Sequence, residues 1–277
     1  GLAIMVTKNA HANTGIVHRI SQKCGARAVH SDNNKRLADV VPNHFLCAMA
    51  FEAPKKLVFL HIPKTAGSSV GQFFDAQYLP TQICHIYNGN VKEQLQSALA
   101  EDSIRFIRGH FGLYKALLEQ LPNPDIFVFT FLREPILRVI SLYNHMQRMQ
   151  SEGHKNRMQD VHSLSDFLAL KTDYNEQTRY LSGIQNKALF LENPEQGFKN
   201  ALQNLEQLNF IGLNEWMKED FTKLCSMLGI AEKIIRHENK GLSNLKQKLL
   251  FFQYKRTVAE HELWDIKIYE SLKKKRK

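Results

Sequence analysis

Short apolar stretches alternate with amphipathic stretches along most of the chain. The apolar stretches are rich in β-branched and aromatic residues, which predicts buried strands over residues 57–60, 104–107, 125–132 and 209–213. Apolar residues at helical spacing predict a helix shortly after 57–60 and further helices over residues 91–100, 114–120, 134–149, 164–170, 198–208 and 215–229, with one or two more over 244–274. This alternation predicts an α/β fold whose central parallel sheet is flanked by helices on both faces.

Residues 1–52 have the weakest pattern of the chain. Pieces such as HANTG and SDNNKR are rich in turn-forming residues and show little periodicity. We therefore expect an N-terminal extension over residues 1–52. The rest, residues 53–277, is expected to form one domain, because no internal repeat or low-complexity linker divides it.

The composition is that of a basic globular protein. The 277 residues include 37 Lys and Arg against 27 Asp and Glu, a net charge of +10, so the surface should attract anions. An anionic nucleotide, an acidic glycan, a nucleic acid or a membrane surface would each satisfy this charge. No run reaches the ~18 apolar residues of a membrane span. The scattered cysteines favour free thiols in a reducing compartment; they are Cys24, Cys47, Cys84 and Cys225.

The segment HIPKTAGSS (61–69) joins the first predicted strand to the helix after it. Backbone N–H groups at a helix start lack intrahelical partners and lie at the positive end of the dipole, so such a turn binds anions. Gly67 allows close approach of the backbone, Lys64 adds a mobile cation, and Ser68 or Ser69 is a natural N-cap. The turn is not a Walker loop, because the order GxxxxGK[ST] is absent.

A second strand-to-helix unit, FLREPILRVISLYNH (131–145), follows the strongest predicted strand. Arg133 lies at the carboxyl end of this strand, where ligands of open α/β sheets collect. Ser141 is about two helical turns further on and shares the helix face reached from Arg133. Arg138 can form a buried structural pair with Glu134 at i,i+4.

Both units resemble parts of one enzyme family. The order Pro-Lys-Thr-x-Gly-Ser-Ser after a strand resembles the 5′-phosphosulfate loop of sulfotransferases, which use 3′-phosphoadenosine-5′-phosphosulfate (PAPS). HIPKTAGSS is most similar to carbohydrate sulfotransferases related to the heparan sulfate 2-O- and 6-O-sulfotransferases and their bacterial relatives. Their 3′-phosphate motif LR[DE]Px-x-R-x-x-S-x-Y is matched at Leu132, Arg133, Glu134, Pro135, Arg138, Ser141 and Tyr143. The resemblance runs from about Lys56 to Tyr269 and implies a P-loop-like three-layer fold.

The resemblance also implies roles for individual residues. The 5′-phosphate ligands would be Lys64, Thr65, Ala66, Gly67, Ser68 and Ser69, and the 3′-phosphate ligands Arg133 and Ser141. Lys64 would also be catalytic, since its ammonium can neutralise the departing nucleotide. Arg179, in NEQTRYLSG, is a candidate ligand of nucleotide or acceptor, with a structural helix role as the alternative. Asn239 and Lys240, in HENKG (237–241), match a nucleotide-side loop of the family.

An acceptor hydroxyl needs a general base, for which a histidine is suited at physiological pH. His110 lies in RGHFGLY, which resembles the segment that supplies the catalytic histidine of the heparan sulfate enzymes. We therefore predict His110 as the base. His61 is expected to orient the loop that contains it, while His145 and His85 are the alternatives to His110.

The sequence thus predicts an O-sulfotransferase that moves a sulfuryl group from PAPS to a carbohydrate hydroxyl by in-line displacement and releases 3′-phosphoadenosine-5′-phosphate (PAP). No metal is implied, because cationic side chains can supply the positive charge. The expected acceptor is an anionic or neutral glycan, with a lipid, small-metabolite or peptide hydroxyl as the alternatives, and no nucleic-acid partner is expected. A Mg-dependent nucleotide kinase and a non-enzymatic basic binder of glycan or nucleic acid are the alternatives. The cytoplasm is the expected compartment, or the Golgi lumen if a membrane anchor has been removed.

Overall fold

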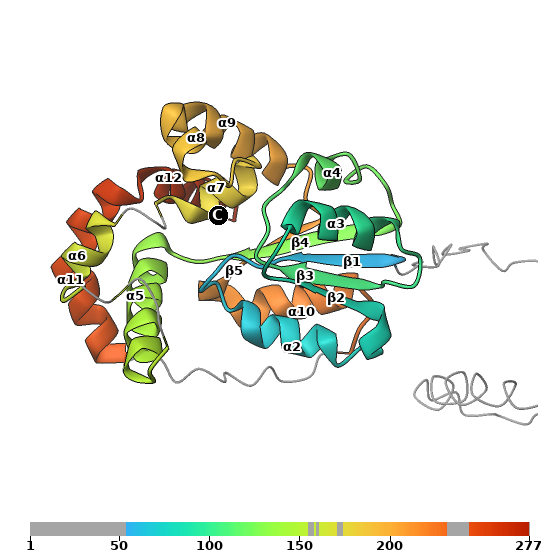
Figure 1. The fold of residues 1–277 in the computed structure, drawn as a ribbon, viewed down its shortest axis with the longest axis horizontal. Helices are drawn as coiled ribbons and strands as arrows, with labels where there is room; N and C mark the ends of the chain where they lie inside the picture. The colour runs from blue at the N-terminus through green and yellow to red at the C-terminus, as the bar shows by residue number, and fades with distance from the viewer. Residues whose placement is uncertain (1–53, 155–157, 159–160, 171–173, 232–243, 277) are drawn as a thin grey trace, which may run out of the picture. The chain divides into compact units, whose positions relative to one another are not determined.

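The computed structural model describes residues 54–154, 158, 161–170, 174–231 and 244–276. Within them, five strands form one sheet in the order β2-β3-β1-β4-β5, and each neighbouring pair is parallel. The strands are β1 (Lys56–Leu60), β2 (Ile83–Ile86), β3 (Phe106–Gly109), β4 (Ile126–Leu132) and β5 (Phe210–Leu213). The predicted α/β fold with a parallel sheet and flanking helices is confirmed (Figure 1).

Helices connect the strands and cover both faces of the sheet. In chain order they are α2 (Gly67–Asp75), α3 (Val91–Ala100), α4 (Lys115–Leu118), α5 (Pro135–Ser151), α6 (Leu164–Ala169), α7 (Glu176–Ser182), α8 (Lys187–Glu192), α9 (Pro194–Leu205), α10 (Met217–Met227), α11 (Asn244–His261) and α12 (Leu263–Lys274). Two 3-10 turns, η1 (Pro80–Gln82) and η2 (Asn214–Trp216), complete the described elements. None of the described helices is long and apolar enough to cross a membrane.

The side chains of β1 alternate between two apolar cores because successive residues of a strand point to opposite faces. Leu57 and Phe59 pack into an aromatic core with α2 and α10, whereas Val58 and Leu60 pack into a mainly aliphatic core on the other face. Figure 1 shows α2 and α10 on one side of the sheet and α3 and α4 on the other. The sheet is therefore the middle of three layers.

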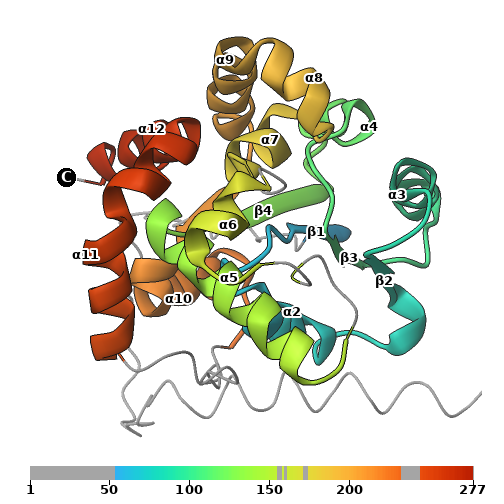
Figure 2. The same ribbon diagram turned by 60° about the vertical axis from the view of Figure 1, so that its left-hand side comes forward.

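A third core joins α5, α6 and α11. It is built from the apolar faces of these helices, including Val139, Phe167 and Val258. Both views show α11 alongside α5 (Figures 1 and 2). Helix α5 begins at Pro135, directly after β4, so this core supports the helix on which Ser141 lies.

The predicted elements differ from the structure in a few places. Strand β2 was not predicted, because Ile83–Ile86 is a short edge strand with only one fully buried residue, and the short helix α8 was also missed. Helix α2 begins at Gly67, so the predicted N-cap at Ser68 or Ser69 is wrong; Ala66 is the N-cap and makes no side-chain capping bond. The extension over 1–52 and the loop with Asn239 and Lys240 lie outside the described residues.

Candidate functional site

The turn between β1 and α2 has an unusual backbone. Lys64 and Ala66 both have positive φ, 68° and 73°, a conformation that costs a non-glycine residue roughly 1–3 kcal/mol. Backbone that alternates in this way turns successive N–H groups towards one side and forms an anion-binding concavity. The strain lies on two of the residues predicted to hold an anion.

The first N–H groups of α2 make no hydrogen bond within the described residues. Among the described residues, nothing accepts from the N–H groups of Gly67, Ser68 and Ser69, since Ala66 gives no side-chain cap. The side chain of Thr65 is fully buried, and its hydroxyl donates to the Ile62 carbonyl at 2.9 Å. The predicted role of Thr65 as a hydroxyl donor to a ligand therefore needs correction, because that proton is already used. Backbone N–H groups and the two serine hydroxyls are the donors that this turn presents.

A glycine is needed at position 67 because the side chain of His61 occupies the space that a Cβ would fill. A Cβ at this position would lie 1.8 Å from Cδ2 and 1.9 Å from Nε2 of His61. The sequence suggested that the glycine lets the backbone approach a ligand closely. The structure instead shows the His61 ring packed against the first residue of α2.

Arg133 joins the second strand end to this turn. It follows β4, the neighbour of β1 in the sheet, and its Nη1 donates to the Lys64 carbonyl at 3.2 Å. Its Nε is buried without a hydrogen-bond partner, and no carboxylate of the described residues lies within 4.0 Å of its guanidinium. An ion that is largely buried and unpaired strongly favours a bound counter-ion. Lys64 likewise has no ion pair within the described part of the chain.

Burial lowers the pKa of both cations. Burial, and then the charges of Arg148 and Arg133, lower the pKa of Lys64 from 10.5 to about 8. Burial also lowers the pKa of Arg133. For Lys64 the neighbouring positive charges add to the effect of burial, whereas for Arg133 the carboxylates of Glu215 and Glu134 oppose it. A bound anion would favour the charged form of Lys64.

One face of α5 continues this positive region. Ser141, His145 and Arg148 follow each other at i, i+4 and i+7 on the helix. Ser141 is partly buried, and its hydroxyl makes no hydrogen bond within the described residues. Arg148 Nη2 lies 3.1 Å from His145 Nδ1, and burial together with the charges of Lys64 and Arg148 lowers the pKa of His145. Of the predicted partners, Arg133 lies just before α5 and Ser141 lies about two turns inside it.

His110 lies directly after β3, the other neighbour of β1. Its ring centroid is 4.6 Å from that of His61 and 4.7 Å from that of Tyr87. Burial, and then the charge of Arg108, lower the pKa of the His110 imidazole to about 4, so the ring is neutral at pH 7 and can accept a proton. The structure therefore brings His110 next to the β1 turn. His85 is exposed and bonded to Asp75 at 3.0 Å instead.

Gln177 is a site residue that sequence reasoning missed. Its Oε1 accepts from the backbone N–H of Arg133 at 2.9 Å, and its Nε2 donates to the Arg133 carbonyl at 3.0 Å. Asp265 in turn accepts from the Gln177 backbone N–H at 3.1 Å. Gln177 lies in the NEQTRYLSG motif, but from the sequence we assigned a role in this motif only to Arg179.

Arg179 is buried and donates to two backbone carbonyls. Its Nε bonds Tyr174 O and its Nη1 bonds Gln185 O, both at 2.8 Å. The structure does not bring its guanidinium together with the β1 turn through any described contact. These bonds favour the structural alternative, and a ligand role for Arg179 stays a prediction.

Arg138 has partners other than the predicted one. Its side chain is fully buried and pairs with Glu176 at 2.7 Å and Glu262 at 3.4 Å, with Asp265 at 3.9 Å. Glu134, the predicted i,i+4 partner, instead accepts from the N–H of Leu137 and caps its own helix. The arginine therefore ties α5 to α7 and to the start of α12.

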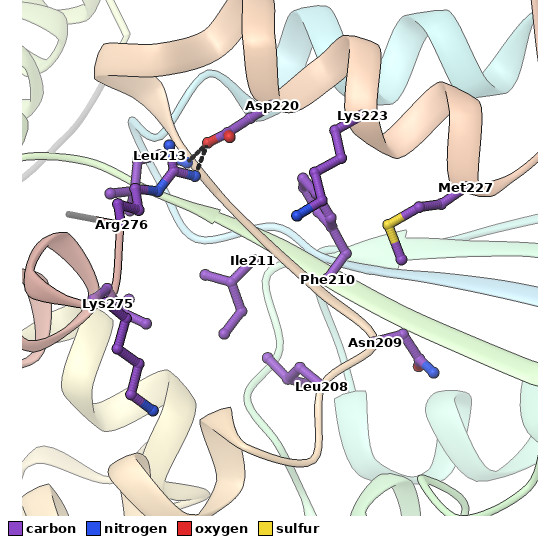
Figure 3. A pocket seen from close by; sticks show the side chains of 11 residues that line it. Leu208, Asn209, Phe210, Ile211, Leu213, Asp220, Lys223, Met227, Lys275 and Arg276 are labelled. Carbon is purple, nitrogen blue, oxygen red and sulfur yellow. Dashed lines mark hydrogen bonds and ion pairs between the residues drawn. The ribbon is translucent and has the colours of Figure 1, made fainter.

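A separate pocket of about 290 Å³ lies beside the edge strand β5 (Figure 3). Figure 3 shows Asp220 joined to Arg276 across it, and Lys275 pairs with Glu206 at 3.4 Å. None of the predicted site residues lines this pocket. We therefore place the candidate site at the ends of β1, β3 and β4.

A family model and several solved structures match the chain. A family model described as "Sulfotransferase family" matches residues 48–275. Among solved structures, the chain is similar to mouse sulfotransferase SULT7A1 complexed with PAP, at 14% identity over 77% of this chain and 67% of that one, with a TM-score of 0.41. A sulfotransferase from Alicyclobacillus acidocaldarius is similar at 16% identity over 78% and 96%, with a TM-score of 0.38.

A structure of retinol dehydratase in a complex with retinol and PAP is similar at 12% identity over 78% of this chain and 83% of that one, with a TM-score of 0.37. These structural similarities are too low to carry an argument about activity. No curated protein matches the chain.

Proposed function

The chain belongs to the sulfotransferase family, and we propose that it moves a sulfuryl group from PAPS to a carbohydrate hydroxyl and releases PAP. The acceptor oxygen attacks sulfur while the bond from sulfur to the bridging oxygen breaks in line with it. The hydroxyl proton passes to His110, and the electron pair of the broken bond leaves with PAP. Such a transfer depends mainly on alignment and on neutralising the charge of the departing phosphate.

One observation carries the proposal: two cations without carboxylate partners among the described residues meet at adjacent strand ends. Arg133 donates to the Lys64 carbonyl, so the two turns touch. The strained turn with Lys64 offers N–H donors for a 5′-phosphosulfate, and Arg133 with Ser141 offers a guanidinium and a hydroxyl for a 3′-phosphate. A donor with an anion at each end matches this pair of sites.

His110 supports the O-transfer step through its position and its charge state. It lies beside the turn with Lys64, and with a pKa of about 4 it is unprotonated at pH 7. Such a weak base becomes stronger when an anion binds nearby, because negative charge favours the imidazolium form. The donor would thus prepare the base that its own reaction needs.

Calorimetry with PAP and 5′-AMP tests the proposed donor. PAP should bind about 10- to 100-fold more tightly than 5′-AMP, the range expected for charge-assisted bonds to one further phosphate. Arg133→Met should remove this preference, whereas the control Arg256→Met, which removes an exposed guanidinium on α11, should keep it. Equal affinity of the wild-type protein for PAP and 5′-AMP would refute the 3′-phosphate site.

Turnover with radiolabelled PAPS and a panel of glycans tests the acceptor. Label should appear on a carbohydrate hydroxyl and not on amines or proteins. His110→Gln should lose turnover while PAP affinity stays near that of the wild type. Transfer to lipids or small metabolites alone would overturn the carbohydrate part of the proposal and leave the donor part standing.

A further inference from the structure

His61 is a buried side chain with one ring nitrogen unaccounted for. Only 7% of the residue is exposed, and its Nδ1 lies 3.3 Å from the hydroxyl oxygen of Tyr87. Nε2 has no hydrogen-bond partner among the described residues. Burial, and then the charges of His110, Arg108 and Lys64, hold the pKa of His61 well below its usual value, so the ring is neutral and carries one proton.

The contacts of Tyr87 favour one position for that proton. Arg108 Nη1 donates to the Tyr87 oxygen at 2.7 Å, and a guanidinium can only donate. The Tyr87 proton therefore has to point elsewhere, and His61 Nδ1 is its one acceptor among the described residues. If Nδ1 accepts, the His61 proton is on Nε2.

Arg108 is itself held in place. Its Nε and Nη2 donate to the two carboxylate oxygens of Asp75, at 2.9 Å and 2.5 Å. A two-pronged pair of this kind fixes the plane of the guanidinium and hence the direction of the third bond, to Tyr87. A chain of contacts thus runs from Asp75 through Arg108 and Tyr87 to His61.

Nε2 of His61 lies next to the first residue of α2. The ring lies so close to Gly67 that an added Cβ there would be 1.9 Å from Nε2. Gly67 is the first residue of α2, where the open N–H donors are. A neutral N–H group at this point adds one more donor to the concavity without adding charge.

From this geometry, and resting on the proposed function, we propose that His61 is a ligand of the donor's 5′-phosphate end, through an Nε2–H whose tautomer Tyr87 fixes. His61 is then a binding residue, and Tyr87 and Arg108 are positioning residues that act through it. The role differs from that of His110, which receives the proton of the acceptor.

Amide substitutions distinguish the two ring nitrogens. The amide nitrogen of Gln occupies roughly the place of Nε2, and that of Asn the place of Nδ1. We expect His61→Gln to keep most of the affinity for PAP and His61→Asn to weaken it about 10- to 100-fold, the loss expected for one bond to a charged ligand. If the Asn variant binds PAP as well as the Gln variant, Nε2 is not a ligand.

Tyr87→Phe tests the positioning role. It removes the hydroxyl that fixes His61, so PAP affinity should fall and the His61 tautomers should become mixed. Tyr78→Phe is the matched control, because the Tyr78 ring stacks on Phe106 and its hydroxyl has no hydrogen bond within the described residues. Unchanged tautomer and unchanged PAP affinity in Tyr87→Phe would overturn the role of Tyr87.

Nitrogen NMR of the wild-type histidine rings gives a readout that needs no folded variant. His61 should show the Nε2–H tautomer, and its Nε2 resonance should shift on addition of PAP while Nδ1 shifts less. An Nδ1–H tautomer, or an Nε2 resonance that PAP leaves unmoved, refutes the inference.

Failure of the proposed function looks different. If the wild-type protein does not bind PAP, the donor assignment fails, and a titration with inorganic pyrophosphate then decides whether His61 Nε2 responds to an anion in the turn.

Discussion

Lys64 should give the reaction a basic pH limit near 8, well below that of an ordinary lysine. In the proposed mechanism its ammonium binds and neutralises the phosphosulfate end of PAPS, and it must be charged to do so. Burial, Arg148 and Arg133 lower its pKa from 10.5 to about 8. Because kcat/KM for PAPS reports groups of the free enzyme, this limit should appear in kcat/KM.

The size of the effect follows from the lowered pKa. With a pKa of about 8, about nine in ten Lys64 side chains are charged at pH 7 and about one in ten at pH 9. The kcat/KM for PAPS should therefore fall about tenfold between these pH values. A lysine at 10.5 would lose almost none of its charge over the same range. The 3′-phosphate of PAPS interferes little, since a phosphate monoester has its second pKa near 6 and is about nine-tenths doubly ionised at pH 7.

Lys64→Arg is the decisive variant, because arginine stays charged throughout. Its activity should be lower than that of the wild type but flat from pH 7 to 9. Lys115→Arg, an exposed substitution on α4, should keep the wild-type fall. The reasoning fails if the wild-type profile is flat to pH 9, or if the same limit persists in Lys64→Arg. Lys64→Ala should lose transfer while its thermal unfolding stays near that of the wild type.

Further predictions concern the base, the turn and the buried ion cluster. In the free protein, His110 should titrate near pH 4 by NMR, and PAP should raise its midpoint; an unchanged midpoint would separate His110 from the donor site. Gly67→Ala should displace the His61 ring and cost roughly 1–3 kcal/mol of unfolding free energy by denaturant titration, together with PAP affinity. Arg138→Met should cost roughly 3–5 kcal/mol, because it leaves buried carboxylates unpaired, whereas Glu262→Gln should cost clearly less; equal losses would contradict this account.

The core strands and the turn could be predicted because their signals are local. The apolar runs at β1 and β4 are continuous since both faces of a parallel sheet are buried. The position of Arg133 and the turn at one edge of the sheet follows from the same logic, because the carboxyl ends of parallel strands lie at one edge. The bond from Arg133 to the Lys64 carbonyl was not predicted. The helix Val91–Ala100 was predicted with its bounds, in agreement with its own cap at Asn90.

The remaining features depend on contacts between distant segments. Arg138 meets Glu262, which is 124 residues further along the chain, and no local pattern specifies that pair. Tyr87 was not predicted as a site residue, because it follows the short edge strand β2, which the sequence did not indicate. The start of α2 was misplaced because serines usually cap helices, whereas here a left-handed Ala66 takes that position and leaves the serines inside the first turn.

The buried polar network has a consequence for the site, because it fixes Arg133 before any ligand binds. Gln177 bonds both the N–H and the carbonyl of Arg133, and Asp265 holds Gln177. The Arg133 side chain then bonds the Lys64 carbonyl, so α7, the end of β4 and the strained turn form one connected unit. A site whose donors and charges are already in place binds and stabilises developing charge without reorganising first. Gln177 of α7 and Asp265 of α12 would therefore contribute to the proposed anion sites through the position of Arg133, without touching the ligand.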